Sequence, residues 1–327
     1  MSQTLSQIAQ SLRDSTKKVQ LIYAFNGTGK TRLSREFRLL VDPKVAVEEQ
    51  DEQEETGIKV MYYNAFTEDL FSWDNDLDGD TDRKLQIRPN NFTNLAMEFL
   101  REQGQDVNIV SNFQYYSSSS ITPFFNDDFS EVTFSFASGG DDRDDNIKIS
   151  KGEESNFIWC VFFSLLEQVI ELRNIVEVED RSTILFNKLE YVFIDDPVSS
   201  LDDTHLIELA VNIATLIKSN QSEIKFIITT HNPLFYNVIF NELNNKDSRY
   251  NYKPKFEKYL LEKNDDGTLV LTPNINDSPF SYHMHLLSIL KEVAVSENIE
   301  KYHFNLLSSQ YICTGNIHRY VQTFEDT

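Results

Sequence analysis

The stretch that decides the fold is Val19–Thr31, VQLIYAFNGTGKT. It opens with the apolar run Val19–Tyr23, passes through a glycine-rich turn, and leads into a helix predicted from Lys30 to about Leu40. The turn matches the phosphate-binding pattern G-x-x-x-x-G-K-[ST], except that Ala24 replaces the first glycine. Because a helix N-terminus presents free backbone N–H groups to an anion, the order strand, loop and helix predicts a nucleoside triphosphate site.

Each loop position has a chemical task in this pattern. Lys30 would reach the β- and γ-phosphate oxygens, and the Thr31 hydroxyl would bind Mg²⁺. Gly27 and Gly29 leave the backbone free of Cβ atoms where the phosphates approach. The nucleotide-binding residues predicted here are Asn26, Gly27, Thr28, Gly29, Lys30 and Thr31.

Two carboxylates end a second buried strand, Tyr191–Ile194. At the carboxyl edge of a parallel sheet, Asp195 would complete the Mg²⁺ shell and Asp196 would orient the attacking water. The expected cofactor is therefore Mg²⁺ with ATP or GTP.

A third segment, Ser150-Lys151-Gly152-Glu153, precedes a long apolar helix. Ser150 and Glu153 have the spacing of an S-x-x-E capping box. A capped helix N-terminus is also an anion site, so structural and nucleotide-binding interpretations are compatible.

Two more residues complete the series. Asp202 follows Ser199-Ser200-Leu201, and His231 follows the strand Ile224–Thr230, 35 residues after Asp196. The joint order of all these segments resembles that of ABC/SMC-type NTPases.

That resemblance implies a nucleotide held between two copies of the chain. Ser150, Gly152 and Glu153 would face the γ-phosphate bound to the partner copy, and Asp202 would lie in the loop beside it. Asp196 and His231 are the expected catalytic residues. Because such ATPases usually have glutamate where Asp196 stands, we expect slow turnover.

Charge limits the partners. The 327 residues carry a net charge of −22, but residues 41–82 contribute −12 and residues 126–145 contribute −6. This distribution argues against a general DNA-coating protein and leaves room for a local RNA site. No leader or membrane segment is expected, and two cysteines cannot form a disulfide framework, so we expect a cytoplasmic location.

Strand–helix alternation predicts an α/β protein. Together with the order of motifs above, it predicts a P-loop NTPase fold of ABC/SMC type with an inserted antiparallel β-hairpin and helical region. We expect an NTPase domain over residues 1–262, with acidic insertions at 41–82 and 126–145, and a small, mostly helical domain over 263–327. The further predicted elements are a strand Ile58–Tyr63, a hairpin pairing Val132–Phe136 with Ile147–Ile149, a buried helix from Lys151 to Ile175, a helix from Thr204 to Lys218, and a helix near Tyr282–Val295.

The chain also resembles the PrrC-type anticodon nucleases of phage defence. The matching stretches are Val19–Phe37, Tyr62–Leu77 (YYNAFTEDLFSWDNDL), Ser150–Phe162, Tyr191–Asn212, Phe226–Leu243 and Tyr302–Leu307. The resemblance implies an NTPase switch followed by a ribonuclease domain that cuts a tRNA anticodon loop, kept latent by a type I restriction-modification complex. It makes Tyr282, His283 and His285, with Phe280, candidate RNA contacts; a partly buried aromatic cluster is the alternative.

The C-terminal residues depart from that family pattern. Family members carry an arginine and, four residues on, a glutamate where this chain has Ser308 and Ile312, and His318 and Arg319 are out of register. In-line RNA cleavage needs groups that move protons and stabilise phosphorane charge. We therefore expect an incomplete, inactive nuclease region with a truncated or frameshifted end.

Two other functions and two metal sites remain as alternatives. The chain could be a non-cutting regulatory or decoy subunit, or a DNA-repair ATPase of the SMC/RecF kind, against which the lack of heptads and of a basic face counts. Asp74–Asp80 matches half of a calcium loop, but Leu85 stands where its bidentate glutamate belongs, so a solvated turn is favoured. His283, His285 and His303 lack neighbouring ligands at metal spacing.

Overall fold

The computed structural model describes residues 3–43, 57–64, 70–76, 78–79, 81–117, 120–137, 143–197, 201–244, 255–264 and 266–273. They belong to one compact unit that spans Met1–Asn274. The predicted loop residues Ser199 and Ser200, and every predicted feature beyond residue 273, lie outside the described residues.

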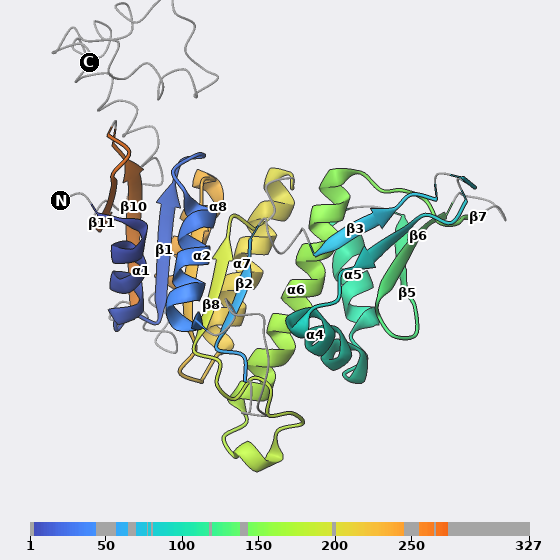
Figure 1. Cartoon of the computed structure of the whole chain (residues 1–327), viewed down its shortest axis with the longest axis horizontal. Coiled ribbons are helices and arrows are strands. Elements are labelled where there is room, and N and C mark those ends of the chain that lie inside the picture. The colour runs from blue at the N-terminus through green and yellow to red at the C-terminus, as the bar shows by residue number, and fades with distance from the viewer. Residues whose placement is uncertain are drawn as a thin grey trace, which may run out of the picture. The chain divides into compact units, whose positions relative to one another are not determined.

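The centre of this unit is a six-stranded sheet in the order β11-β10-β1-β9-β8-β2 (Figure 1). Neighbouring strands are parallel except for the outermost pair, β10 and β11. The strands are β1 Val19–Ala24, β2 Val60–Tyr63, β8 Tyr191–Asp195, β9 Lys225–Thr230, β10 Phe256–Lys263 and β11 Leu269–Pro273.

Helices cover both faces of this sheet, which confirms the α/β class (Figure 1). On one side lie α1 and α2, and on the other lie α7 and α8. Leu33 and Phe37 project from α2 and are fully buried, and the Phe37 ring meets Tyr191 at a centroid distance of 5.0 Å. The bounds are α1 Leu5–Asp14, α2 Lys30–Val41, α7 Asp203–Ser219 and α8 Pro233–Leu243.

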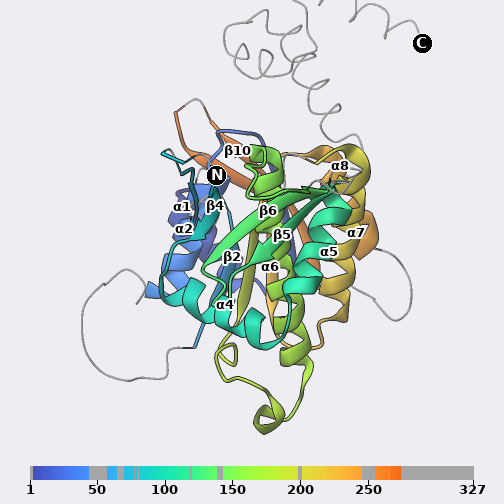
Figure 2. The same cartoon turned by 90° about the vertical axis from the view of Figure 1, so that its right-hand side faces the viewer.

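A second sheet follows β2 in the chain, where a hairpin and helices were expected. It has five strands, in the order β3-β4-β6-β5 with β7 paired to β6, and it carries α4 and α5 (Figure 2). The elements are β3 Phe71–Asp74, β4 Lys84–Ile87, α4 Asn91–Glu102, α5 Asp106–Ser117, β5 Ile121–Phe125, β6 Glu131–Ala137 and β7 Arg143–Asp144.

Three sequence expectations need correction. The strand returning beside β6 is β7, not Ile147–Ile149; Ile147 only donates a backbone hydrogen bond to Phe134. The acidic segment 41–82 is not wholly an insertion, because β2 is an edge strand of the main sheet. The unit that contains the main sheet extends to Asn274 rather than to residue 262, because β11 completes that sheet.

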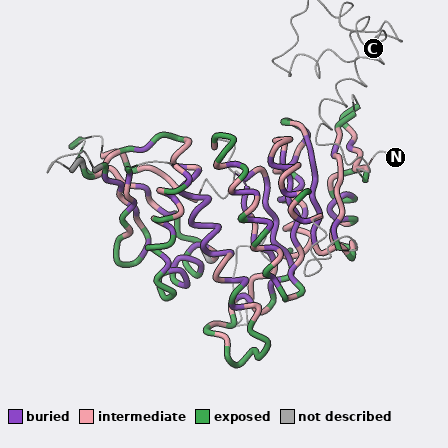
Figure 3. The backbone as a smooth tube through the Cα atoms, turned by 180° about the vertical axis from the view of Figure 1, so that it is seen from behind, coloured by how far each residue is buried: buried purple, intermediate pink, exposed green. Residues whose placement is uncertain are grey.

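Helix α6, Lys151–Asn174, lies between the two sheets (Figure 1). Its Trp159 packs on Tyr63 of β2, and its Phe157 packs on Phe134 of β6. By length and composition α6 could cross a membrane, but 78% of its most apolar window is buried inside the protein. Burial continues from α6 into the central strands (Figure 3), so α6 is the core helix shared by both sheets. It leads through the short 3₁₀ helix Val178–Asp180 to β8.

Candidate functional site

The phosphate loop joins the carboxyl end of β1 to the N-terminus of α2. Gly27 and Gly29 have φ angles of 80° and 107°, a backbone region that residues with a Cβ atom rarely adopt. Gly29 is the N-cap of α2, and Thr28 donates its hydroxyl to the carbonyl of Phe25 at 2.8 Å. The first backbone N–H groups of α2 are therefore free of side-chain caps, as anion binding requires.

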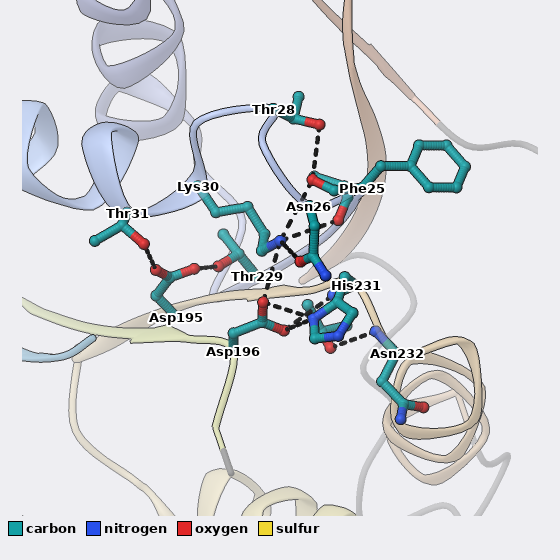
Figure 4. Close-up of polar contacts among 12 residues, drawn as sticks. Phe25, Asn26, Thr28, Lys30, Thr31, Asp195, Asp196, Thr229, His231 and Asn232 are labelled. Carbon is teal, nitrogen blue, oxygen red and sulfur yellow. Dashed lines mark hydrogen bonds and ion pairs between the residues drawn. The ribbon is translucent and has the colours of Figure 1, made fainter. Parts of the chain in front are cut away.

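The Lys30 side chain folds back over this loop (Figure 4). Its Nζ donates to the carbonyl oxygens of Ala24 and Phe25 at 3.2 and 3.4 Å and to Oδ1 of Asn26 at 3.3 Å. It also forms an ion pair with Oδ2 of Asp196 at 3.1 Å. The ammonium is thus surrounded by oxygen atoms at the mouth of the loop.

Asp195 links β8 to the loop and to β9. It accepts a hydrogen bond from the Thr31 hydroxyl at 2.6 Å and another from the Thr229 hydroxyl. Burial raises the pKa of Asp195 above its usual value, and the two hydroxyl donors oppose this effect. The Thr31 hydroxyl and the Asp195 carboxylate are hard oxygen ligands, so they fit Mg²⁺, which takes one or two protein oxygens beside substrate phosphates.

Asp196 has a left-handed backbone conformation, with φ of 51°. The His231 backbone N–H donates to its Oδ1 at 3.0 Å, and Nδ1 of the His231 ring lies 2.7 Å from both carboxylate oxygens. Burial acts to raise the pKa of Asp196, but the His231 hydrogen bond and the Lys30 charge outweigh it and lower that pKa. Asp196 is therefore an ionised carboxylate beside the phosphate loop, in a conformation that costs backbone energy.

The structure thus brings together the residues predicted from three separate segments. They are Asn26, Gly27, Thr28, Gly29, Lys30 and Thr31 from the loop and the start of α2, Asp195 and Asp196 at the end of β8 and directly after it, and His231 after β9.

The remaining residues predicted to bind nucleotide lie at the N-termini of α6 and α7. Ser150 is the N-cap of α6, and it forms the predicted reciprocal capping box with Glu153. Gly152 lies in the first turn of the same helix. Asp202 is the N-cap of α7, where its Oδ1 accepts from the backbone N–H groups of Thr204 and His205.

Sequence reasoning missed two polar contacts near these residues. Thr229 is the first of two threonines that end β9, two positions before His231, and this polar end of the strand was the available signal. Glu154 is buried in the first turn of α6 and accepts a hydrogen bond from the Trp73 indole at 2.8 Å. No local pattern indicated that second contact, because it joins residues 81 positions apart.

The remaining predicted sites are the acidic turn at Asp74–Asp80, the metal clusters and the RNA contacts. The favoured solvated turn at Asp76 is confirmed: its carboxylate accepts from the backbone N–H groups of Gly79, Thr81 and Asp82, which lowers its pKa to about 2. In the described part of the chain, no three His, Cys, Asp or Glu side chains form a metal cluster. The RNA-contact candidates Phe280, Tyr282, His283 and His285 lie outside that part.

Comparison with solved structures gives only weak likenesses. The Smc head bound to the C-winged helix domain of ScpA is 12% identical with a TM-score of 0.38, over 80% of this chain and 91% of that chain. The archaeal ribosome recycling factor aABCE1 in complex with the stalk protein aP1 has the same identity and TM-score, over 80% and 39%. The Smc head of Pyrococcus yayanosii is 17% identical with a TM-score of 0.33, over 59% and 30%.

Sequence comparison is much stronger. A family model described as an AAA domain matches residues 130–321. The protein named anticodon nuclease from Escherichia coli is 52% identical over 338 residues, covering 97% of this chain and 83% of that protein.

Proposed function

Since the chain belongs to the PrrC-type anticodon nuclease family, we propose that residues 1–274 form an ATP- or GTP-hydrolysing switch of such a nuclease. The match to an AAA domain and the anticodon nuclease relative support the assignment of the chain as an enzyme. The geometry of the candidate site bears on nucleotide hydrolysis only. One observation carries the proposal: Lys30 and Thr31 of the phosphate loop contact Asp196 and Asp195 at the end of β8.

This arrangement supplies the groups that phosphoryl transfer requires. The loop backbone and Lys30 bind and orient the triphosphate. Asp196, ionised and hydrogen-bonded to His231, would orient the attacking water and accept its proton, and His231 would contact the γ-phosphate. Mg²⁺, held by Thr31 and Asp195, would neutralise phosphate charge when bound.

The test is nucleotide binding and hydrolysis by the purified chain. We expect a fluorescent ATP or GTP analogue to bind the wild-type protein with Mg²⁺ and to be displaced by the unlabelled nucleotide. Lys30→Met should weaken binding more than tenfold. If the wild-type protein binds neither analogue, and neither unlabelled nucleotide competes, the proposal is overturned.

The partners belong to the same proposal. In ABC-type enzymes the first turn of the helix equivalent to α6 faces nucleotide on a second subunit, so we propose a nucleotide-sandwich dimer closed by Ser150, Gly152, Glu153 and Asp202. Family membership supports a type I restriction-modification complex as the regulating partner, a tRNA anticodon loop as the RNA partner, a cytoplasmic location and a role in antiviral defence.

The nuclease step is proposed to be absent. Ser308 and Ile312 can neither donate strongly to a phosphorane oxygen nor act as a general base, which in-line cleavage needs. Incubation with total tRNA should therefore leave anticodon loops intact while nucleotide is hydrolysed. Cleavage that disappears in the His318→Ala and Arg319→Ala variants would show instead that the region acts as a nuclease.

A further inference from the structure

The segment that leads into α6 is anchored to β3 on both sides of Ser150. Before Ser150, Lys148 places its Nζ 5.7 Å from the centroid of the Trp73 ring and donates to Oδ1 of Asn75 at 2.7 Å. After Ser150, the Trp73 indole donates to Oε2 of Glu154 at 2.8 Å. The position of Ser150 is therefore set from β3 as well as from its own helix.

Stability alone does not explain why a glutamate is buried at position 154. Its carboxylate is buried, and its second oxygen, Oε1, pairs with Nζ of Lys151 at 2.7 Å. Burying a carboxylate has a large desolvation cost, and replacing such groups with apolar side chains is often neutral or stabilising. A directional hydrogen bond from an indole to a carboxylate instead fixes geometry.

Trp73 is itself held in place. Its ring packs on Phe134 at a centroid distance of 5.8 Å, and Phe134 packs on Phe157 of α6 at 5.2 Å. The indole N–H thus comes from a rigid position in the second sheet. Any shift of β3 would move the first turn of α6 with it.

The chain segment that contains β3 also reaches α2, the helix that follows the phosphate loop. Asn64, the residue after β2, donates to the Ser34 hydroxyl of α2 at 2.7 Å, and Ser34 donates to the carbonyl of Thr31 at 2.8 Å. Asn64 and Trp73 stand nine positions apart. The segment therefore touches α2 at one end and the start of α6 at the other.

From these contacts we infer that Trp73 and Glu154 are positioning residues, which hold Ser150 and Gly152 where they can close on nucleotide bound by a second copy of this chain. This inference rests on the proposed nucleotide site. It assigns the YYNAFTEDLFSWDNDL stretch a task in hydrolysis, although none of its described residues lies in the phosphate loop.

The test separates nucleotide binding from hydrolysis. Trp73→Phe keeps an aromatic ring but removes the N–H donor. We expect it to bind nucleotide with a Kd within about twofold of wild type, because the loop contacts are untouched. Its turnover should fall roughly ten- to a hundredfold, since small misplacements of catalytic groups have effects of that size. The protein concentration that gives half-maximal turnover should rise.

Trp159→Phe is the matched control, because it makes the same change on α6 at a site that packs on Tyr63. This variant should keep the wild-type turnover and the wild-type dependence of turnover on protein concentration. The chain has two tryptophans, so a nucleotide-dependent change in fluorescence should persist in Trp159→Phe and vanish in Trp73→Phe.

A Trp73→Phe protein with wild-type turnover and concentration dependence would overturn the inference. So would one that also loses nucleotide binding, because the contact would then serve general stability. Failure of the proposed function is seen separately, as absence of nucleotide binding by the wild-type chain.

Discussion

The Nζ atom of Lys30 lies 3.1 Å from Oδ2 of Asp196, so the cation of the phosphate loop is paired with the carboxylate proposed to activate water. Lys30 opens α2 after the loop that follows β1, and Asp196 directly follows β8; β9 separates these two strands in the sheet. A triphosphate would compete with Asp196 for this lysine. Nucleotide binding is therefore expected to free the carboxylate at the moment when it is needed.

Lys30→Met tests this pairing. We expect nucleotide affinity to fall more than tenfold, because the charge-assisted contact to the phosphates is lost. The free energy of unfolding should fall by about 1–3 kcal/mol, because Asp196 is left half-buried and without its cation. Titration calorimetry and urea unfolding measure the two effects. Lys218→Met, which breaks the pair with Glu242, is the control and should leave affinity unchanged.

Asp196→Asn and His231→Ala test the second pair at the site. Asparagine tolerates the left-handed backbone conformation, so the fold should be retained. We expect nucleotide to bind while turnover falls about 10²–10⁴-fold in Asp196→Asn, which lacks the proton acceptor. Because the two side chains act as a unit, the double variant should be little slower than the slower single variant. Multiplying effects would contradict the pairing.

Asp195→Asn tests the effect of burial on stability. Because the pKa of Asp195 is raised above 3.8 in the folded protein, its ionised form reduces stability at neutral pH, and this penalty disappears as pH falls below 3.8. Without Mg²⁺ and nucleotide, Asp195→Asn should be more stable than wild type at pH 7. The gain should shrink toward pH 4 in urea unfolding. A variant less stable than wild type at pH 7 would show that the Thr31 and Thr229 hydrogen bonds outweigh burial.

Ser150→Ala tests whether the N-cap of α6 has a second task. Loss of the cap should lower the free energy of unfolding by about 1 kcal/mol. Turnover should fall as well, because the hydroxyl is proposed to face the partner copy's nucleotide. Asn90→Ala removes the comparable capping box of α4 and should reduce stability alone. Equal turnover in the two variants would limit Ser150 to capping.

Much of the main sheet was predictable, because its signals are local. The apolar runs of β1, β8 and β9 and the periodicity of α2 and α7 occupy the expected places. The second sheet was not predictable in the same way. Its strands β3, β4 and β5 are short. Leu85 of β4 lies opposite Val132 of β6, with α4, α5 and β5 between them in the sequence, so no turn signal fixes that register.

The site shows the same division. Lys30, Thr31, Asp195, Asp196 and His231 follow strand ends, where topology alone brings side chains together. The details within it depend on packing. The left-handed conformation of Asp196, the Thr229 hydroxyl on Asp195 and the Trp73–Glu154 contact each require three-dimensional neighbours that the linear pattern does not reveal.

Helix α6 forms a wall of both halves of the described unit, so neither half has a complete apolar interior without it. Fragments made by cutting the chain just before or just after α6 would each expose apolar surface and would aggregate rather than fold. Heating should accordingly melt both sheets in a single cooperative calorimetric transition. For the same reason, length changes between strands of the second sheet are tolerable at its surface loops, whereas an insertion inside α6 would disrupt both halves together.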